Sequence, residues 1–337
     1  MTPSLEKYLS EGGSLGSLAN RPPKRAATAS FPCDPADVYE RQVAALAKRL
    51  SRIGVKDVTI GISGGLDSAL CLLVAVGAFD RLGIPRSGIH VYTMPGFGTT
   101  TRTKGNADKL CEGLGLALET IDITPACRQH FKDIGHDGVT PDVTFENAQA
   151  RMRTLILMDK ANMTGGIVLG TGDLSEIALG WCTYNGDHMS MFGVNSGVPK
   201  TVVRKVCAHM AENTALLTPD GAAALKDIVA TPVSPELVKG QVTEDKIGPY
   251  ELHDFFIWNF IVNGLDRPEL ADAAKKFFTG TYDDATIAKT LDTFLVRLVS
   301  QAFKRNCAPD GIRIFDFDFS PSSWHIPSDL PKEALWE

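Results

Sequence analysis

Two features that mark other protein classes are missing from this chain of 337 residues. The seven cysteines are odd in number and are never spaced C-x-x-C, so buried free thiols in a reducing cytosol are the preferred interpretation. There is no long uninterrupted apolar stretch and no charged-then-apolar leader, so neither membrane insertion nor export is indicated. We therefore expect a cytoplasmic protein that has no membrane partner.

The chain also lacks an excess of positive charge. Its formal net charge is −6, which gives no support to a nucleic-acid or membrane-surface role, although a local basic groove within an acidic chain stays open. The composition, 44% hydrophobic and 22% charged, is ordinary for a globular protein with one large or two small domains.

Two common nucleotide-binding motifs are absent as well. The phosphate-binding pattern G-x-x-x-x-G-K-[ST] does not occur, and the dinucleotide spacing G-x-G-x-x-G is missing, also around Gly96 and Gly98. A nicotinamide dehydrogenase is therefore disfavoured.

What the chain does have is a different glycine-rich loop, G-I-S-G-G-L-D-S, at residues 61–68. It lies between an apolar strand-like run and an apolar helix-like run, so its backbone N–H groups gather at a helix N-terminus, where they can bind a pyrophosphate. Gly64 and Gly65 let the backbone approach phosphate oxygens, and Asp67 offers a carboxylate to a phosphate-bound Mg²⁺. The alternative, an ordinary glycine-rich turn, has no use for two serines and an aspartate.

Strands and helices alternate along residues 36–210. We expect strands at 57–60, 88–93, 118–123 and 166–170, and helices from Asp37 to Ile53 and over 68–79, 103–114 and 145–162. This order predicts an α/β fold with a doubly wound, mostly parallel sheet whose ligands bind at the carboxyl ends of the strands. Residues 1–35 are interpreted as a flexible tail or remnant interdomain linker, and residues 211–337 as a mostly helical extension with helices over 250–262 and 286–304.

Three further segments carry polar groups of uncertain role. Asp173 and Glu176 follow the fourth strand with the spacing of a helix capping box, and Glu176 is equally consistent with a magnesium ligand facing the glycine-rich loop. Asn147, Arg151 and Thr154 share a predicted helix face that, taken alone, favours a solvated surface. Cations at Lys200 and Lys304 are weak signals of phosphate binding by themselves.

These segments occur in one order that resembles the synthetase portion of the glutamine-dependent NAD⁺ synthetases. That family belongs to the ATP pyrophosphatases, or PP-loop enzymes, with a Rossmann-like fold of the adenine nucleotide alpha-hydrolase type. The resemblance extends from about Pro32 to Leu330. It is carried by S-G-G-L-D-S, M-P-G-F, D-V-T-F-E-N-x-Q-A, V-L-G-T-G-D-L-S-E-x-A-L-G-W-C-T-Y, G-V-P-K-T, K-I-G-P-Y-E-L-x-D-F-F and F-K-R.

The resemblance implies that a carboxylate of nicotinic acid adenine dinucleotide is adenylated by Mg-ATP and then amidated by ammonia, giving NAD⁺, AMP and pyrophosphate. It implies catalytic roles for Asp67, Glu176 and Lys200, with Asp67 and Glu176 as Mg²⁺ ligands. The implied contacts of the co-substrate ATP are Gly61, Ile62, Ser63, Gly64, Gly65, Leu66, Asp67, Ser68, Met94, Thr171 and Lys200. The implied contacts of the deamido dinucleotide are Asn147, Arg151, Glu176, Trp181, Cys182, Thr183, Tyr184 and Lys304.

The resemblance also implies a homodimer or larger homo-oligomer. Glutamine-dependent members carry an N-terminal glutaminase domain, which the residues before Asp37 cannot contain. We therefore expect free ammonia or a separate glutaminase as the nitrogen source, unless the chain is a fragment of a longer protein. The remaining alternatives are another PP-loop enzyme, such as a tRNA-modifying or GMP-forming enzyme, and a nucleotide-binding module without catalysis.

Overall fold

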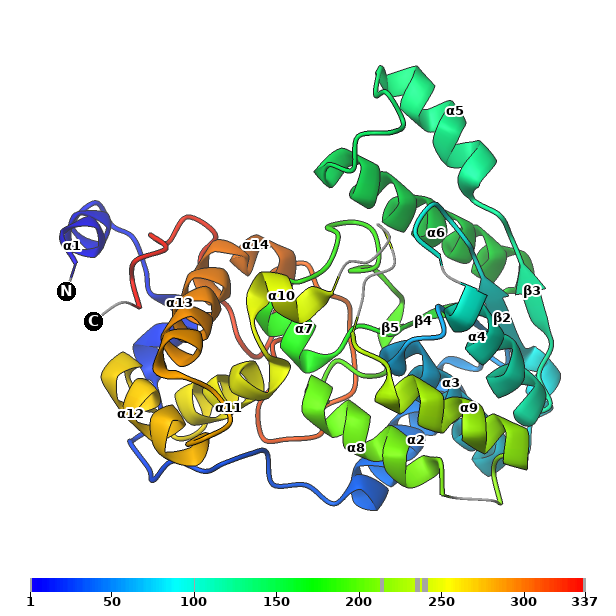
Figure 1. Ribbon diagram of the computed structural model, residues 1–337, viewed down its shortest axis with the longest axis horizontal. Coiled ribbons are helices and arrows are strands. Elements are labelled where there is room, and N and C mark those ends of the chain that lie inside the picture. Colours follow the sequence, from blue (N-terminus) through cyan, green and yellow to red (C-terminus); the bar gives the residue numbers. More distant parts are fainter. Residues whose placement is uncertain (1, 100, 213–214, 234–236, 238–241, 336–337) are drawn as a thin grey trace.

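A five-stranded parallel sheet forms the centre of the computed structural model, which describes residues 2–99, 101–212, 215–233, 237 and 242–335, with side chains omitted at 101–104 (Figure 1). The strands run in the order β3-β2-β1-β4-β5, and every neighbouring pair is parallel. Their bounds are Val58–Gly61 for β1, Ile89–Thr93 for β2, Leu118–Thr120 for β3, Ile167–Gly170 for β4 and Phe192–Gly193 for β5.

The predicted parallel α/β sheet is confirmed, with two differences. The third strand ends three residues earlier than expected, at Thr120. The strand β5 was not predicted, because two residues give no readable pattern.

Helices cover both faces of the sheet. On one face α6 (Val143–Thr164) packs against β1 and β4, and α5 (Thr124–Ile134) lies on α6 at the top of Figure 1. On the other face α3 (Leu66–Leu82) packs against β1, with α2 (Pro35–Ile53) and α8 (Lys200–Met210) behind it. The helices α4 (Thr101–Gly113) and α9 (Pro219–Ala230) pack against each other beside them.

The sequences of α2 and α3 explain their different positions. In α3 almost every residue is apolar, so the helix is buried on nearly all sides. In α2 the apolar residues form one stripe, which buries Val38, Val43, Leu46 and Leu50. The stripe was expected to continue to Ile53, but that side chain is 41% exposed because the helix ends there.

The second half of the chain adds a helical body to the left of the sheet in Figure 1. It contains α10 (Thr243–Ile247), α11 (Tyr250–Ile261), α12 (Arg267–Phe277), α13 (Asp284–Ser300) and α14 (Ala302–Arg305), and it contacts the sheet region through α7 (Leu174–Leu179) and α8. The helices expected over 250–262 and 286–304 are present as α11 and as α13 with α14, whereas α12 was not predicted. The proposed division into domains stays a prediction.

Residues 21–31, within the segment that precedes α2, pack against this helical body. The segment contains α1 (Pro3–Ser10) and a short 3-10 helix (Gly16–Asn20), and the Phe31 side chain is buried against Trp258 and Phe315. Thr28 exchanges backbone hydrogen bonds with the Asn259 side chain at 2.9 Å. This packing differs from the expected flexible tail, because aromatic contacts outweigh the polar composition, and a linker role for the segment stays a prediction.

Candidate active site

The order of the strands creates a crevice between β1 and β4. The chain leaves β1 toward β2 and leaves β4 toward β5, so the loops after these two central strands diverge at the carboxyl edge of the sheet. A cavity of about 660 Å³ opens there. Of the residues predicted to bind ligands, it is lined by Gly61, Ile62, Ser63, Asp67, Ser68, Met94, Asn147, Thr171, Glu176, Trp181, Cys182, Thr183, Tyr184 and Lys304.

The first of the two loops, residues 61–68, is here called the phosphate loop. Gly64 has a positive φ of 85°, which a residue with a Cβ adopts only at a cost, and Gly65 precedes α3 without any side-chain cap. The Ser63 hydroxyl accepts a hydrogen bond from Gly65 N at 3.1 Å, and the Ser68 hydroxyl donates to Gly65 O at 3.1 Å. The uncapped first turn of a 17-residue helix therefore faces the cavity with N–H groups available to an anion.

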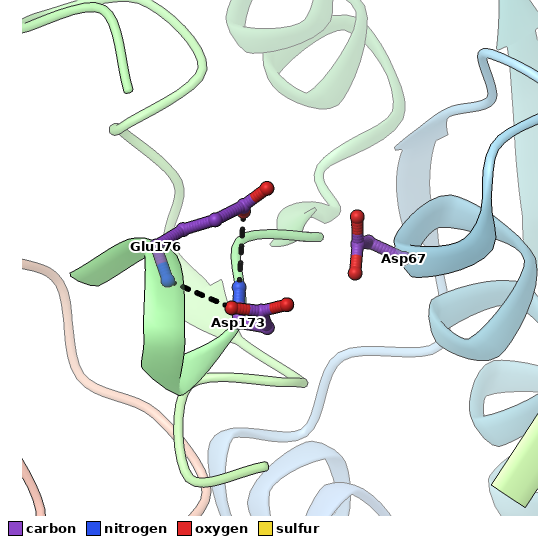
Figure 2. Close-up of side chains that lie close together, drawn as sticks. All are labelled: Asp67, Asp173 and Glu176. Atoms are coloured by element: carbon purple, nitrogen blue, oxygen red, sulfur yellow. Dashed lines mark hydrogen bonds between the residues drawn. The ribbon is translucent and has the colours of Figure 1, made fainter. Parts of the chain in front are cut away.

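Three carboxylates meet across the crevice, and Figure 2 shows them facing one another. Asp67 belongs to the first turn of α3, Asp173 is the N-cap of α7, and Glu176 is in the first turn of α7. Oxygen atoms of all three lie within 4.8 Å of one another. We call these three residues the carboxylate cluster.

The ammonium group of Lys200 lies at the centre of the carboxylate cluster. Its Nζ atom is 2.6 Å from Asp67 Oδ2 and 2.9 Å from both Asp173 Oδ2 and Glu176 Oε1. The Lys200 side chain is only 2% exposed, and Lys200 is the first residue of α8, where a cation is unfavourable beside the helix dipole. The three carboxylates offset this cost.

Two other helices hold Lys200 in this place. The preceding Pro199 provides no side-chain cap for α8. Instead, Lys200 N donates to the hydroxyl of Ser175 in α7 at 2.9 Å, and Thr201 N donates to the carboxylate of Asp254 in α11 at 2.8 Å. Ser175 in turn donates to Asp254. The cap of α8 therefore comes from residues far away in the sequence.

The two interpretations of Asp173 and Glu176 turn out to be compatible. Glu176 N donates to Asp173 Oδ1 at 2.8 Å, and Asp173 N donates to Glu176 Oε2 at 3.3 Å, so the capping box is present (dashed lines in Figure 2). The other oxygen of each carboxylate, Asp173 Oδ2 and Glu176 Oε1, points to Lys200. One oxygen of each residue caps the helix, and the second belongs to the carboxylate cluster.

Burial and the neighbouring charges shift the pKa values of Glu176, Asp173 and Lys200. Burial raises the pKa of Glu176 to about 7 and the pKa of Asp173 well above its ordinary value, while Lys200 opposes both shifts. Burial alone would lower the pKa of Lys200, but the carboxylates of Asp173, Asp67 and Glu176 raise it well above its ordinary value. The lysine is therefore charged at neutral pH, whereas Asp173 and Glu176 take up protons more readily than exposed carboxylates do.

Residues of this cluster fit a divalent cation. Asp67 Oδ1 and Asp173 Oδ2 are buried and make no hydrogen bond, although Asp173 Oδ2 contacts the Lys200 ammonium. Buried polar atoms without hydrogen bonds are rare and call for a ligand or an ion. Carboxylate oxygens are the ligands that Mg²⁺ prefers.

The other end of the cavity lies beyond the C-terminus of α7. Lys304 Nζ donates to Gly180 O at 2.9 Å and Cys182 O at 2.7 Å, which leaves one of its three N–H groups for a ligand. The Thr183 hydroxyl donates to Asn147 Oδ1 at 2.9 Å, so these two residues lie together as a polar pair.

Arg151 lies outside the cavity lining, unlike the position expected for it. Its Nε donates to Tyr184 O at 3.2 Å, and its side chain is exposed. Asn147 and Thr154 do line the cavity, together with Arg153, whose Nε donates to Met94 O at 3.0 Å. The cavity-facing stripe of α6 therefore passes through 150, 153 and 157 rather than through 151, a choice that spacing within one helix could not settle.

Other predicted residues also lie behind the cavity wall. Gly64, Gly65, Leu66 and Lys200 do not line it, although Lys200 contacts two carboxylates that do. Asp173 was interpreted only as a cap, yet it is part of the cluster; the capping-box spacing concealed this second role.

Comparison with known proteins shows the family of this chain. A family model described as NAD synthase matches residues 38–277. The chain belongs to the NAD synthase family. It is 38% identical to the glutamine-dependent NAD(+) synthetase of Mycobacterium leprae over 91% of this chain and 51% of that protein. It is 30% identical to the protein of the same name from Thermotoga maritima over 86% of this chain and 47% of that protein. The chain thus spans about half the length of the curated relatives it matches.

Solved structures share the fold of this NAD synthase family chain. The crystal structure of a glutamine-dependent NAD(+) synthetase from Cytophaga hutchinsonii superposes with a TM-score of 0.73 at 16% identity, covering 89% of this chain and 55% of that one. The NH3-dependent NAD synthetase of Campylobacter jejuni gives a TM-score of 0.56 at 20% identity, covering 81% and 96%. Within the described residues, no helix is long and apolar enough to span a bilayer.

Proposed function

We propose that this chain is a ligase that makes NAD⁺ from nicotinic acid adenine dinucleotide, ATP and ammonia, releasing AMP and pyrophosphate. The observation that carries the proposal is the joining, in one cavity, of the phosphate loop, the carboxylate cluster and the polar end near Lys304. In this proposal the triphosphate and the second nucleotide bind in one continuous cavity. Membership of the NAD synthase family supports the same reaction.

The first chemical step follows from the charge of the substrate. A carboxylate is a poor electrophile, so its oxygen attacks the α-phosphorus of ATP, and pyrophosphate leaves. The phosphate loop binds the triphosphate through backbone N–H groups and the hydroxyls of Ser63 and Ser68. Mg²⁺, when held by Asp67, Glu176 and Asp173, supplies positive charge to the phosphate oxygens. Lys200 adds a second cation beside them.

The second step is the attack of ammonia on the carbonyl carbon of the adenylate, with AMP as the leaving group. It needs no covalent enzyme nucleophile, so the chain contributes mainly alignment of the two nucleotides and exclusion of water. We assign the deamido dinucleotide to the end of the cavity formed by Trp181, Tyr184, Asn147 and Lys304, with Met94 and Thr171 near ATP. Arg153 replaces Arg151 as the arginine of α6 that reaches the cavity.

The same proposal includes a homodimer formed through α6. Leu155 and Met163 are 56% and 79% exposed on this helix. Apolar side chains gathered on one long helix are typical of a protein interface. A Leu155→Glu substitution is expected to shift the mass measured by light scattering toward the monomer; an unchanged dimer would place the interface elsewhere.

One assay tests the proposed reaction. The chain is incubated with Mg-ATP, nicotinic acid adenine dinucleotide and ammonium, and NAD⁺ and AMP are measured. Equal amounts of the two are expected, and ammonium makes the result independent of any separate glutaminase. ADP as the product, or no turnover with ammonium, would contradict the proposal, and turnover of a tRNA or of a GMP precursor would favour another PP-loop enzyme.

A further inference from the structure

A fully buried asparagine connects the two segments that carry the carboxylate cluster. Asn195 lies two residues after β5 and is 0% exposed. Its Nδ2 group donates to Asp67 O at 2.8 Å and to Thr171 O at 3.0 Å. Asp67 lies in the first turn of α3, after β1, and Thr171 follows β4, so one side chain bridges both sides of the crevice.

A second buried side chain fixes the orientation of Asn195. Gln42, from α2, is also 0% exposed, and its Nε2 donates to Asn195 Oδ1 at 3.1 Å and to Val194 O at 3.0 Å. Backbone carbonyls can only accept hydrogen bonds, so the end of Asn195 that faces two of them must be its NH₂ group. Both hydrogens and the oxygen of this amide are then satisfied, and the side chain has a single orientation.

The Asn195 side chain lies beyond the last paired residues of β1 and β4. The paired residues of β1 and β4 are Val58 with Ile167 and Thr59 with Val168, and the pairing stops before either strand ends. Beyond that point side chains join the two loops: Lys200 contacts the three carboxylates, and Asn195 connects the backbone of both loops. The amide of Asn195 therefore fixes the separation of the two loops at the level of the backbone.

We propose that Asn195, oriented by Gln42, is a positioning residue that sets the separation of Asp67 from Asp173 and Glu176. The inference rests on the proposed function for its kinetic consequence, but not for its effect on cation binding. Through this spacing Asn195 determines how the carboxylate cluster holds a divalent cation and hence how ATP is aligned for attack. Asn195 itself does not touch the reacting atoms in this arrangement.

The test compares two buried amides. Asn195→Ala is expected to lower kcat about 100-fold, because small misplacement of reacting groups has effects of that size. It is also expected to weaken the binding of Mn²⁺ in the presence of ATP about 10-fold, the loss typical of outer-shell partners. The matched control is Asn259→Ala, which removes a fully buried amide that bonds to Thr28, Phe255 and Asn263 and to no residue of the cluster. It is expected to lower the melting temperature without changing either quantity.

Gln42→Met gives a second measurement if Asn195→Ala does not fold. It removes the donor that orients Asn195 but leaves the bridge, so a smaller loss of the same kind is expected. Wild-type Mn²⁺ affinity in the folded variants, or an equal loss of kcat in Asn259→Ala, would overturn the inference. Mn²⁺ affinity is measured without the dinucleotide, so failure of the proposed reaction leaves this result interpretable.

Discussion

The two ends of the short helix α7 differ in how their charges are satisfied. At its N-terminus lie Asp173 and Glu176, joined by Asp67 and a single cation, Lys200. At its C-terminus lie three cations and several backbone carbonyls. Both arrangements agree with the helix dipole, which favours anions at the first turn and cations at the last.

The cations at the C-terminus have partners in the chain itself. Arg297 donates to Leu179 O and Gly180 O, Lys304 donates to Gly180 O and Cys182 O, and Arg305 donates to Ala178 O and Leu298 O. These contacts satisfy the carbonyls that a buried helix end leaves open, so this end is mainly structural.

The N-terminus is different, because three carboxylates share one ammonium group and Asp67 Oδ1 makes no hydrogen bond. Buried charged side chains whose partners all lie within the chain stabilise the fold. Buried charged side chains that lack some of their partners can bind a ligand instead. The comparison therefore separates a structural group from a functional one on the same helix.

The largest expected effect is at the N-terminus of α7. Glu176→Ala, like Asp67→Ala, is expected to lower kcat for pyrophosphate release by about 1,000-fold, since charge stabilisation in the reaction is lost. The matched control is Glu269→Ala, because Asp266 and Glu269 form the same capping box in α12. This control is expected to lose about 1 kcal/mol of stability and no activity. If Glu176→Ala loses only stability, Glu176 acts as a cap alone.

At the C-terminus of α7 we expect substitutions to reduce stability instead. Arg305 is 2% exposed, and burial lowers the pKa of its guanidinium to about 9. Arg305→Met is expected to reduce the free energy of unfolding by about 3 kcal/mol, because buried carbonyls lose their donors. Urea unfolding measures this change, with Arg313→Met at an exposed position as the control. A loss as small as that of the control would show that the C-terminal group is not structural.

A buried neutral residue on the adjoining helix α11 gives the expected pH dependence. Burial lowers the pKa of His253 to about 4, below its ordinary value of 6.5, so the folded state disfavours protonation. Stability from this group is complete above pH 6.5 and is lost as the pH falls toward 4. The contribution of Asp254 to the pH dependence of stability has the opposite sign. Burial raises its pKa from 3.8 to about 6, so the folded state favours protonation of this group as the pH falls.

The variant His253→Gln separates these two contributions. It retains a donor for Ile247 O, which His253 Nε2 contacts at 2.8 Å, but it does not titrate. Between pH 7.5 and 4.5 the wild type is expected to lose about 2–3 kcal/mol more stability than the variant. Parallel stability curves for the two proteins would contradict the assignment to His253.

The smallest expected effect is at Lys304, which belongs to the structural end but reaches the cavity. Its remaining N–H group is available to the dinucleotide, so Lys304→Met is expected to raise KM for that substrate about 10-fold, with little change in kcat. Initial rates at varied dinucleotide concentration measure this split. A fall in kcat with unchanged KM would instead give Lys304 a role in the reaction, like that of the residues at the N-terminus of α7.

Local patterns predicted much of the fold and part of the site. The apolar runs before Gly61 and Gly170 predicted two strands that the structure confirms, and the glycines and serines between Gly61 and Ser68 predicted the loop at the start of α3. The helix α8 was not predicted, although the spacing of Val202, Val206 and Met210 is helical. Its start carries no local signal, because its cap comes from Asp254, 53 positions beyond Thr201. The role of Asp173 was hidden because one of its oxygens makes an ordinary helix cap.

The sequence alone determined the alternation of strands and helices and the anion-binding loop, because each of these depends on residues close together in the chain. It also determined the resemblance to a family, which depends on the order of short motifs along the chain. Only the tertiary structure decided that Lys200 lies among three carboxylates and that Asn195 bridges two loops. Lys200 and Asp67 are 133 positions apart, and Asn195 and Asp67 are 128 apart. Their contact depends on β1 and β4 being neighbours, and that strand order is set by packing of the whole sheet.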